Sequence, residues 1–431
     1  MNLFIFRRDL RLYDNTALLK SLNNETATIF IMDPAQVKNN EYRSEKALNF
    51  MISSLYDLMT DIEGNHGKLA VFHGDPVDVL KRLVNRENIN EIYINRDYTP
   101  FSIKRDERIK EFSIKNNIKF NALDDYFLSD PELRTGSGSF FKNFTAFYNR
   151  AMEINVKKPV YEIKKSNLIP IDGDDMELKY NNYGRKTAIE KMHNFIKNDY
   201  SLRDFPELNM TSFLSADIKF GNISIREAYH YIKDPEFRRQ LYWRDFYLYI
   251  AYHFPYVFGS NFNRKYNIKW ENKEKYIDAW KNGLTGYPIV DAAMRSLNET
   301  GYINNRLRMI VSSFLVKDLH VDWRIGEKYF AQKLIDYDPA SNNGNWQWVA
   351  STGVNSRGMY RIINPWIQQK KFDPECKFIK RYVNELSDLE PEIIHNLYKI
   401  RLNNYPAPLV DHKTAVMEFR KLINQTPTYL S

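Results

Sequence analysis

Cysteine is nearly absent from this chain, which has one, Cys376, among 431 residues. A single cysteine excludes a disulfide within the chain, and the eight histidines show no metal-ligand spacing with it. The lack of disulfides is typical of proteins from a reducing compartment. The sequence therefore predicts a site without metal in a cytoplasmic protein.

Long hydrophobic runs are also absent, which bears on membrane association. No apolar stretch approaches the roughly 20 residues that span a bilayer. Arg7, Arg8 and Asp9 directly follow the first apolar run, which argues against a signal peptide. We therefore expect no contact with membranes. We also expect the protein to be a monomer.

Glycine is sparse, and its pattern excludes one common kind of nucleotide site. No Gly-x-Gly-x-x-Gly follows the first apolar run, so a dinucleotide held by that fingerprint is not expected there. Apolar runs at 3–6, 28–32, 68–72 and 91–95 alternate with helical periodicity at 44–59 and 76–84. This alternation predicts an α/β domain over residues 1–128, with a doubly wound, Rossmann-like parallel sheet.

The rest of the chain has a different pattern. Residues 129–184 are rich in Pro, Gly, Ser, Lys and Asp and have little periodicity, so we expect an interdomain linker. From 185 to 431 strand signals largely vanish and amphipathic segments follow one another, including 291–297 and 306–317. Residues 224–227 (SIRE) form a capping-box pattern. The second domain, 185–431, should be all helical.

Acidic residues are fewer than basic ones, 54 against 62, which gives a net charge of +8. An excess of this size on a large protein is compatible with a polyanionic partner such as DNA but does not require one.

The most unusual stretch is residues 336–348 (DYDPASNNGNWQW), which combines two carboxylates, three asparagines and two tryptophans. Asp338 before Pro339 predicts an N-cap with proline at the first helical position. Capping and packing can explain each residue singly. Together, the residues suit a flat, polar, redox-active ligand at the start of a helix.

This stretch resembles the flavin-binding loop of the photolyase and cryptochrome family, and other segments match that family in order. They are residues 4–15 (FIFRRDLRLYDN), 243–246 (WRDF), 285–292 (TGYPIVDA), 305–309 (NRLRM) and 314–317 (FLVK). The resemblance covers nearly the whole chain and is strongest to class I cyclobutane pyrimidine dimer photolyases. It implies a light-driven carbon–carbon lyase that repairs such dimers in UV-damaged DNA by electron transfer from excited, reduced FAD.

The resemblance also implies which residues hold FAD. A pyrophosphate cradle is expected at Thr211, Ser212, Phe213, Leu214 and Ser215, where hydroxyls and free amides precede a helix, although a simple capping turn has the same composition. The other matching positions are Tyr200, Gln240, Arg244, Arg308, Asp336, Asp338 and Asn342. Asn342 matches the side chain that faces flavin N5, where an amide can accept from the reduced N5–H. Tyr200 lies one residue closer to Arg203 than the family's tyrosine usually does.

Two further groups of matching positions concern electrons and DNA. Trp346, Trp323 and Trp270 match three tryptophans that relay an electron from the surface to the photoexcited oxidised flavin; without the resemblance they would be core aromatics. Trp243 and Trp348 match the aromatic walls of the pocket for a flipped-out dimer, where stacking returns about 1–3 kcal/mol per base. The positions expected to meet the lesion or the DNA are Arg203, Trp243, Asn305, Arg306, Trp348 and Arg361.

Four positions are expected to govern the reaction itself, namely Asn342, Gln240, Asn305 and Met309. Enzymes that repair the (6-4) photoproduct have histidines where this chain has Asn305 and Met309, which favours the cyclobutane dimer as substrate. Gln240 stands where cyclobutane-dimer enzymes have a glutamate, so we expect retained but less efficient repair. Glutamine also occurs there in (6-4) photolyases and cryptochrome photoreceptors, and both remain alternatives.

Family members carry a second, antenna chromophore in the α/β domain. Residues 95–100 (NRDYTP) lie where that pocket usually is. The candidates are 8-hydroxy-5-deazaflavin, FMN or FAD, and methenyltetrahydrofolate, with a deazaflavin or a second flavin favoured over the folate.

Overall fold

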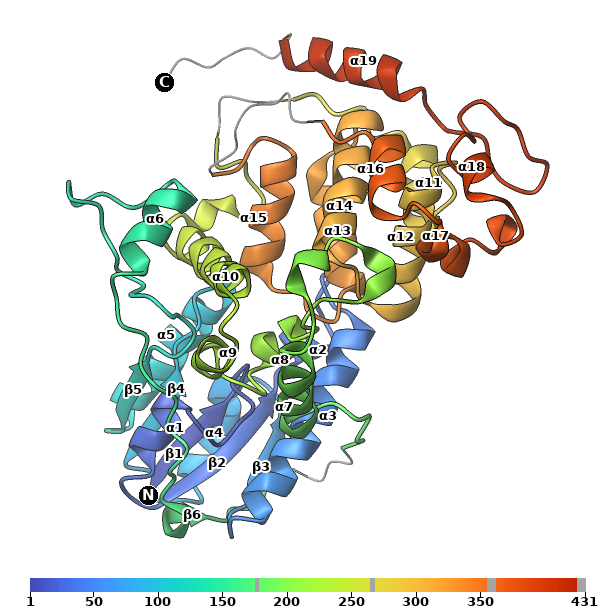
Figure 1. The fold of residues 1–431 in the computed structure, drawn as a ribbon. Coiled ribbons are helices and arrows are strands. Elements are labelled where there is room, and N and C mark those ends of the chain that lie inside the picture. The colour runs from blue at the N-terminus through green and yellow to red at the C-terminus, as the bar shows by residue number, and fades with distance from the viewer. Residues whose placement is uncertain (175–177, 264–267, 355–361, 425–431) are drawn as a thin grey trace. The chain divides into compact units, whose positions relative to one another are not determined.

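The computed structural model describes residues 1–174, 178–263, 268–354 and 362–424. The chain, drawn as a ribbon in Figure 1, divides into two compact units. Each unit has its own hydrophobic core. Unit 1 comprises Met1–Lys197 and Ser212–Pro255, and unit 2 comprises Asn198–Thr211 and Tyr256–Ser431. The segment of unit 2 between residues 198 and 211 therefore interrupts unit 1 in sequence.

Unit 1 contains a parallel sheet that has six strands within the described ranges. The strands are β1 (Asn2–Phe6), β2 (Thr26–Met32), β3 (Leu69–His73), β4 (Glu91–Asn95), β5 (Lys119–Leu123) and β6 (Leu168–Ile169). The order is β3-β2-β1-β4-β5, and β6 pairs with the start of β2. The predicted α/β fold and its first four strands are confirmed. The sequence missed β5 because this edge strand is half exposed and has no continuous apolar run.

The strand order reverses at β1, which lies between β2 and β4. Phe4 is in register with Thr28 of β2 on one side and with Tyr93 of β4 on the other. Ligands of open parallel sheets bind at the carboxyl ends of the strands beside such a reversal. Arg7 follows β1 there and donates hydrogen bonds to the backbone oxygen of Asn95 and to Asp106.

The described α-helices of unit 1 are α1 (Thr16–Ser21), α2 (Pro34–Val37), α3 (Glu45–Glu63), α4 (Pro76–Val84), α5 (Pro100–Lys115), α6 (Phe144–Ala151), α7 (Arg185–Phe195), α8 (Ser215–Phe220), α9 (Ile225–Tyr231) and α10 (Pro235–His253). All of these helices except α7 and α8 begin at a side-chain cap. Asp75 accepts from the backbone N–H of Val77 and precedes Pro76 at the first position of α4. The predicted capping box is confirmed, because Ser224 and Glu227 exchange side chain-to-backbone bonds at the start of α9.

The predicted linker is more structured than its sequence indicates. Within 129–184 the structure has α6, a short 3₁₀ turn at Lys165–Asn167, and β6. Asn143 caps α6 by accepting from the N–H of Ala146 at 3.2 Å. β6 adds two residues to the sheet through long-range pairing, which local periodicity cannot reveal.

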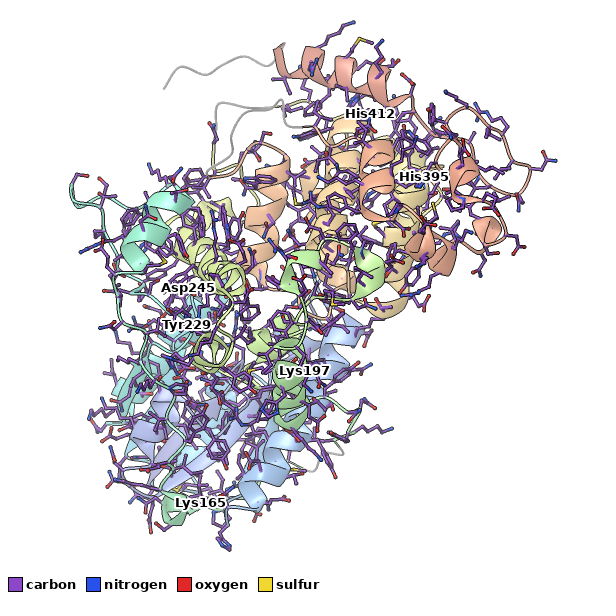
Figure 2. All side chains as sticks on the ribbon, in the orientation of Figure 1. Lys165, Lys197, Tyr229, Asp245, His395 and His412 are labelled. Atoms are coloured by element: carbon purple, nitrogen blue, oxygen red, sulfur yellow. The ribbon has the colours of Figure 1, made fainter. Side chains whose placement is uncertain are left out.

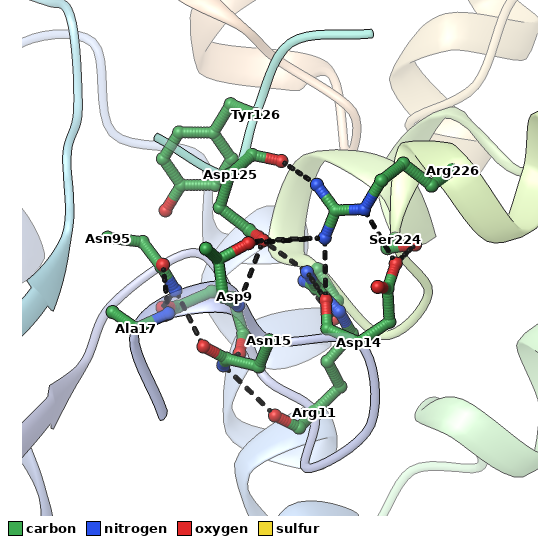
Figure 3. Close-up of polar contacts among 12 residues, drawn as sticks. Asp9, Arg11, Asp14, Asn15, Ala17, Asn95, Asp125, Tyr126, Ser224 and Arg226 are labelled. Carbon is green, nitrogen blue, oxygen red and sulfur yellow. Dashed lines mark hydrogen bonds and ion pairs between the residues drawn. The ribbon is translucent and has the colours of Figure 1, made fainter. Parts of the chain in front are cut away.

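A buried ionic network explains why α9 belongs with the sheet in unit 1 (Figure 3). Arg226 donates to Asp14 Oδ2 at 2.9 Å and to Asp125 Oδ1 at 2.7 Å, and Arg11 also pairs with Asp125. Burial alone would raise the pKa of Asp125, but Arg11 and Arg226 hold it well below its usual range. Because α7–α10 pack with unit 1, the compact units differ from the expected limits at residues 128 and 184, which remain predictions.

The described residues of unit 2 form helices joined by loops and contain no strand. Its helices are α11 (Glu274–Asn282), α12 (Pro288–Thr300), α13 (Asn305–Ser313), the π-helix η5 (Phe314–Asp318), α14 (Trp323–Lys333), α15 (Pro339–Val349), α16 (Pro365–Phe372), α17 (Lys377–Tyr382), α18 (Pro391–Ile394) and α19 (His412–Asn424). Short 3₁₀ turns cover Tyr200–Leu202, Pro206–Leu208 and Asn384–Leu386. The core of this unit is formed mainly by α12, α13, η5 and α14. None of the described helices has both the length and the apolar character needed to span a lipid bilayer.

The family-like segment 285–292 has a structural role in unit 2. Asp291, fully buried on α12, accepts from Thr285 N at 2.8 Å, Gly286 N at 3.1 Å and Tyr405 Oη at 2.5 Å. Burial raises the pKa of Asp291 to about 6. Gly286 has φ of +76°, and an added Cβ would lie 2.4 Å from the backbone of Ala407, so only glycine fits here. These bonds tie the start of α12 to the 405–407 segment.

Candidate functional site

The stretch 336–348 leads into α15 and includes all but the last residue of this helix, which begins where the sequence predicts. Asp338 is the N-cap and accepts from the N–H of Ser341 at 2.9 Å, with Pro339 at the first helical position. The helix buries Asn342, Trp346 and Gln347 among its polar and aromatic side chains. Three buried carboxamides, of Asn342, Asn343 and Gln347, and a buried indole on one short helix form an unusual core surface, because buried polar groups require hydrogen-bond partners.

Asn342 has a fixed amide orientation. Its Nδ2 lies 3.0 Å from the backbone oxygen of Glu327 and 3.0 Å from Glu327 Oε1. A backbone carbonyl can only accept, so the atom facing it must be the NH₂ group. In the described part of the chain both side-chain bonds of Asn342 use Nδ2, which leaves Oδ1 as an acceptor.

Glu327 lies on α14 and was not expected from the sequence. Its side chain is 6% exposed, and burial raises its pKa to about 7, opposed by the hydrogen bond from Asn342. A carboxyl group with this pKa changes its charge near neutral pH. The sequence offered one signal for it, a glutamate in an otherwise apolar position of a helix, but only the fold shows its contact with Asn342.

Arg308 and Asp336, both expected near FAD, form an ion pair. One guanidinium nitrogen of Arg308 lies 3.0 Å and 2.8 Å from the two carboxylate oxygens of Asp336, and Nε donates to Ile303 O at 2.8 Å. The Asp336 side chain is 7% exposed and that of Arg308 is 28% exposed. The pair therefore links the start of α13 to the segment before α15 and keeps its cationic edge accessible.

The expected phosphate cradle lies where the chain passes from unit 2 to unit 1. In unit 2, Thr211 Oγ1 and Tyr302 Oη are 3.0 Å apart. In unit 1, Ser212 Oγ accepts from Leu214 N at 3.3 Å, and Phe213 has a left-handed φ of +54°. Ser215 is the first residue of α8. The backbone turns sharply here and α8 has no side-chain cap at its start.

Trp270, Trp323 and Trp346 all lie in unit 2 with different environments. Trp346 is 2% exposed and packs on Gly326 of α14, where an added Cβ would lie 2.2 Å from the indole. Trp323 is 1% exposed and donates to Asn261 Oδ1 at 3.0 Å, while Trp270 is half-buried. Among the described residues, the ring contacts of Trp346 are with Trp280 and Phe330, and none joins the three tryptophans directly. Trp280 was not expected from the sequence.

Gln240, Trp243 and Arg244 lie within about one turn of α10, in unit 1. Gln240 is exposed and Trp243 is half-buried. Arg244 donates to Tyr126 O at 2.6 Å and lies 3.4 Å from Asp245. Asp245, labelled in Figure 2, accepts from the backbone N–H groups of Leu128 and Ser129 at 2.7 Å and 3.1 Å. Burial raises the pKa of Asp245 to about 6, opposed mainly by Arg244.

The expected DNA-contacting residues of unit 2 have protein partners. Arg306 pairs with Asp204 and lies over the Phe372 ring at 4.4 Å. Arg203 lies over the ring of Tyr200 at 4.7 Å, so these two expected residues are brought together.

The remaining expected positions lie on or near α13 and α15. Asn305 is exposed, with Nδ2 3.7 Å from Met309 Sδ. Trp348 is half-buried on α15. Arg361 lies outside the described residues.

The chemistry of these groups fits a flavin. The free Oδ1 of Asn342 is an acceptor in a largely buried setting, which suits a ring N–H, and the accessible edge of Arg308 suits an electron-rich or anionic group. Within the described ranges no three His, Cys, Asp or Glu side chains gather in a way that could hold a metal ion.

Two family models match the chain. Residues 2–164 match the DNA photolyase model, and residues 237–425 match the model of the FAD-binding domain of DNA photolyase. The second match spans the end of unit 1 and nearly all of the helical unit 2.

Relatives and solved structures agree with these models. The chain is 34% identical to a deoxyribodipyrimidine photo-lyase from Buchnera aphidicola, over 96% of this chain and 95% of that protein. It is 46% identical, with a TM-score of 0.91, to an archaeal photolyase from Sulfolobus tokodaii that contains two FAD molecules, over 98% of this chain and 99% of that one. It is 25% identical, with a TM-score of 0.87, to a cryptochrome from Synechocystis, over 97% and 98% of the two chains.

Proposed function

The chain belongs to the DNA photolyase family, and we propose that it is a deoxyribodipyrimidine photo-lyase that repairs cyclobutane pyrimidine dimers in DNA under blue light. The single observation that carries this proposal is the fixed orientation of Asn342, a largely buried residue whose acceptor oxygen is directed away from Glu327. When bound, reduced FAD supplies one electron on illumination, which the dimer accepts and returns after its cyclobutane bonds break.

The proposed cofactor residues bind and orient the flavin. Asn342 Oδ1 accepts from the ring N–H and provides no strong acid, so it favours the reduced ring without driving further protonation. Arg308, held by Asp336, presents a cation to the ring system. The phosphates are proposed to lie on Thr211 to Ser215, with Tyr200, Gln240, Arg244 and Asp338 as further contacts.

The proposed lesion residues use stacking and charge. Trp243 and Trp348 each offer an aromatic face on which a flipped-out base can stack, and Gln240 donates a hydrogen bond to a pyrimidine carbonyl. Arg203, Arg306 and Arg361 contact the DNA backbone. Trp346, Trp323 and Trp270 carry electrons inward when the cofactor is oxidised.

A second flavin in unit 1 is the antenna that we propose. The archaeal photolyase with two FAD molecules, 46% identical over 98% of this chain, supports this choice over a folate or a deazaflavin. We further propose that the protein is a cytoplasmic monomer.

Two alternatives are less well supported. A photoreceptor function rests on Gln240 and on the similarity to the Synechocystis cryptochrome. Repair of the (6-4) photoproduct is disfavoured because Asn305 and Met309, on α13, offer no ionisable group that could act as an acid.

One illumination experiment tests the proposal. Protein loaded with FAD and reduced anaerobically is mixed with an oligonucleotide that contains one thymine dimer, and the dimer is quantified after blue light and after darkness. We expect dimer loss in light only. Trp243→Ala should reduce this loss, whereas Trp366→Ala, at a partly buried tryptophan of unit 2 without a proposed role, should not. Intact dimers after illumination of flavin-loaded protein refute the repair function, and the same assay with a (6-4) lesion tests that alternative.

A further inference from the structure

The indole of Trp243 is covered by an aromatic ring from the segment that reads as a linker. Phe144, at the start of α6, lies flat against Trp243, with ring centroids 3.5 Å apart and planes 7° from parallel. Tyr148, one helical turn further along α6, stacks on Phe144 at 5.5 Å and 17°. Three rings from α6 and α10 thus form a continuous stack within unit 1.

Phe144 is itself held rigidly. It is 1% exposed and meets Phe246 of α10 edge-on at 5.8 Å. Asn143 is the N-cap of α6 and directly precedes Phe144, so the cap fixes the backbone of Phe144. The ring is fixed separately, by its burial and its contact with Phe246. A side chain locked at both levels can hold a neighbour in one rotamer.

Trp243 is the less constrained partner, because it is half-buried on α10. Phe246 and Tyr247 contact it at 5.9 Å and 5.6 Å, both from its own helix. Within the described residues, the only ring contact of Trp243 with another helix is the one with Phe144. The orientation of the indole relative to α10 therefore depends mainly on Phe144.

We propose that Phe144 is a positioning residue for lesion recognition, which holds the Trp243 indole in the conformation that receives the flipped-out dimer. This inference rests on the proposed function of Trp243. An indole that is already ordered loses little side-chain freedom when a base stacks on it, so the stack increases the affinity for the lesion. The segment 129–184 then contributes to substrate recognition as well as connecting the two halves of the sequence.

DNA binding in the dark tests this inference without relying on turnover. Phe144→Leu removes the flat ring and should weaken binding to dimer-containing DNA roughly 3- to 10-fold, the range expected for an aromatic pair. Affinity for undamaged DNA of the same sequence should stay unchanged. Phe144→Tyr, which keeps the ring, should retain most of the preference for damaged DNA. If Phe144→Leu does not fold, Phe144→Met replaces it, since methionine keeps the volume and loses the flat face.

A matched control lies one turn away on the same helix. Phe147 is fully buried and packs on Phe246 and Tyr249 rather than on Trp243. Phe147→Leu should destabilise α6 to a similar degree and leave the preference for damaged DNA intact. The positioning role is wrong if Phe144→Leu and Phe147→Leu lose the preference for damaged DNA equally. It is also wrong if Phe144→Leu keeps this preference.

A double-mutant cycle with Trp243→Ala completes the test. If Phe144 acts through Trp243, Phe144→Leu should have no further effect on lesion affinity in the Trp243→Ala background. If the losses of lesion affinity from Phe144→Leu and Trp243→Ala add up in the double variant, the inference about Phe144 is refuted and the proposed function stays in place. A wild-type protein that does not distinguish damaged from undamaged DNA would instead refute the proposed function of Trp243.

Discussion

The buried carboxyl group of Glu327 should make the stability of this protein depend on pH in an unusual direction. Burial raises its pKa from 4.5 to about 7. One pH unit corresponds to ~1.36 kcal/mol, so ionising this group in the folded protein costs about 3 kcal/mol. The side chain is 6% exposed, so solvent screening reduces this cost little.

The sign of the effect follows from proton linkage. Below pH 4.5 the carboxyl group is protonated in both the folded and the unfolded protein, so it contributes nothing. Between 4.5 and about 7 the unfolded chain loses this proton while the folded protein keeps it, so stability falls as the pH rises. Above about pH 7 the whole penalty is present.

Glu327→Gln removes this penalty because the amide stays neutral and its oxygen can still accept from Asn342. The free energy of unfolding of the variant minus that of the wild type should increase by about 3 kcal/mol from about pH 4.5 to about pH 8. Denaturant unfolding of both proteins at the two pH values measures this difference, and any constant effect of the extra amide N–H cancels. Glu299→Gln, at an exposed position of α12, is the matched control. A variant-minus-wild-type difference that is the same at both pH values would refute the reasoning.

Four further predictions follow from the site and the fold. Gln240→Glu should raise the number of dimers repaired per absorbed photon, because a carboxylic acid can share a proton with the dimer; an unchanged light-dose curve contradicts this. Trp346→Phe should slow photoreduction of the oxidised protein, followed by absorption, and leave repair by chemically reduced protein intact. Arg226→Met should lower the free energy of unfolding by about 3–5 kcal/mol, since Asp14 and Asp125 lose a buried partner, and denaturant titration measures this. Affinity for damaged DNA should fall as salt rises, and Arg306→Ala should reduce the logarithmic slope by about 1; an unchanged slope excludes a phosphate contact at Arg306.

Local sequence signals predicted much of the fold. They failed for elements whose formation or position depends on contacts between residues far apart in the sequence. The caps at Asp338 and Ser224 were predictable because their partners lie three residues along the chain. α6 and β6 were missed because they are short and stabilised by packing on α10 and pairing with β2. The grouping of α9 with the sheet depends on the Arg226 network, whose carboxylates are about a hundred or more positions away in sequence.

The candidate site shows the same division. Arg308 and Asp336 could be named from the sequence because both lie in segments that match the family, and the structure joins them in an ion pair. Glu327 and Phe144 could not be found in this way, since each acts on a partner from another helix, Asn342 and Trp243. The side chains that we propose to contact a ligand could be named from the sequence. The side chains that orient them were found only in the structure.

The matching segments contain residues of two physical kinds, and hydrogen-bonding capacity distinguishes them. Asp291 uses its carboxylate oxygens on protein partners, so its presence in the family-like segment 285–292 is explained by the fold itself. Asn342 differs, because its NH₂ group is fully engaged by Glu327 while its oxygen keeps its acceptor capacity in a largely buried setting. An acceptor that has no protein partner can take a hydrogen bond from a ligand that carries an N–H group. Asn342 is therefore a residue whose acceptor capacity the protein contacts leave available for a ligand.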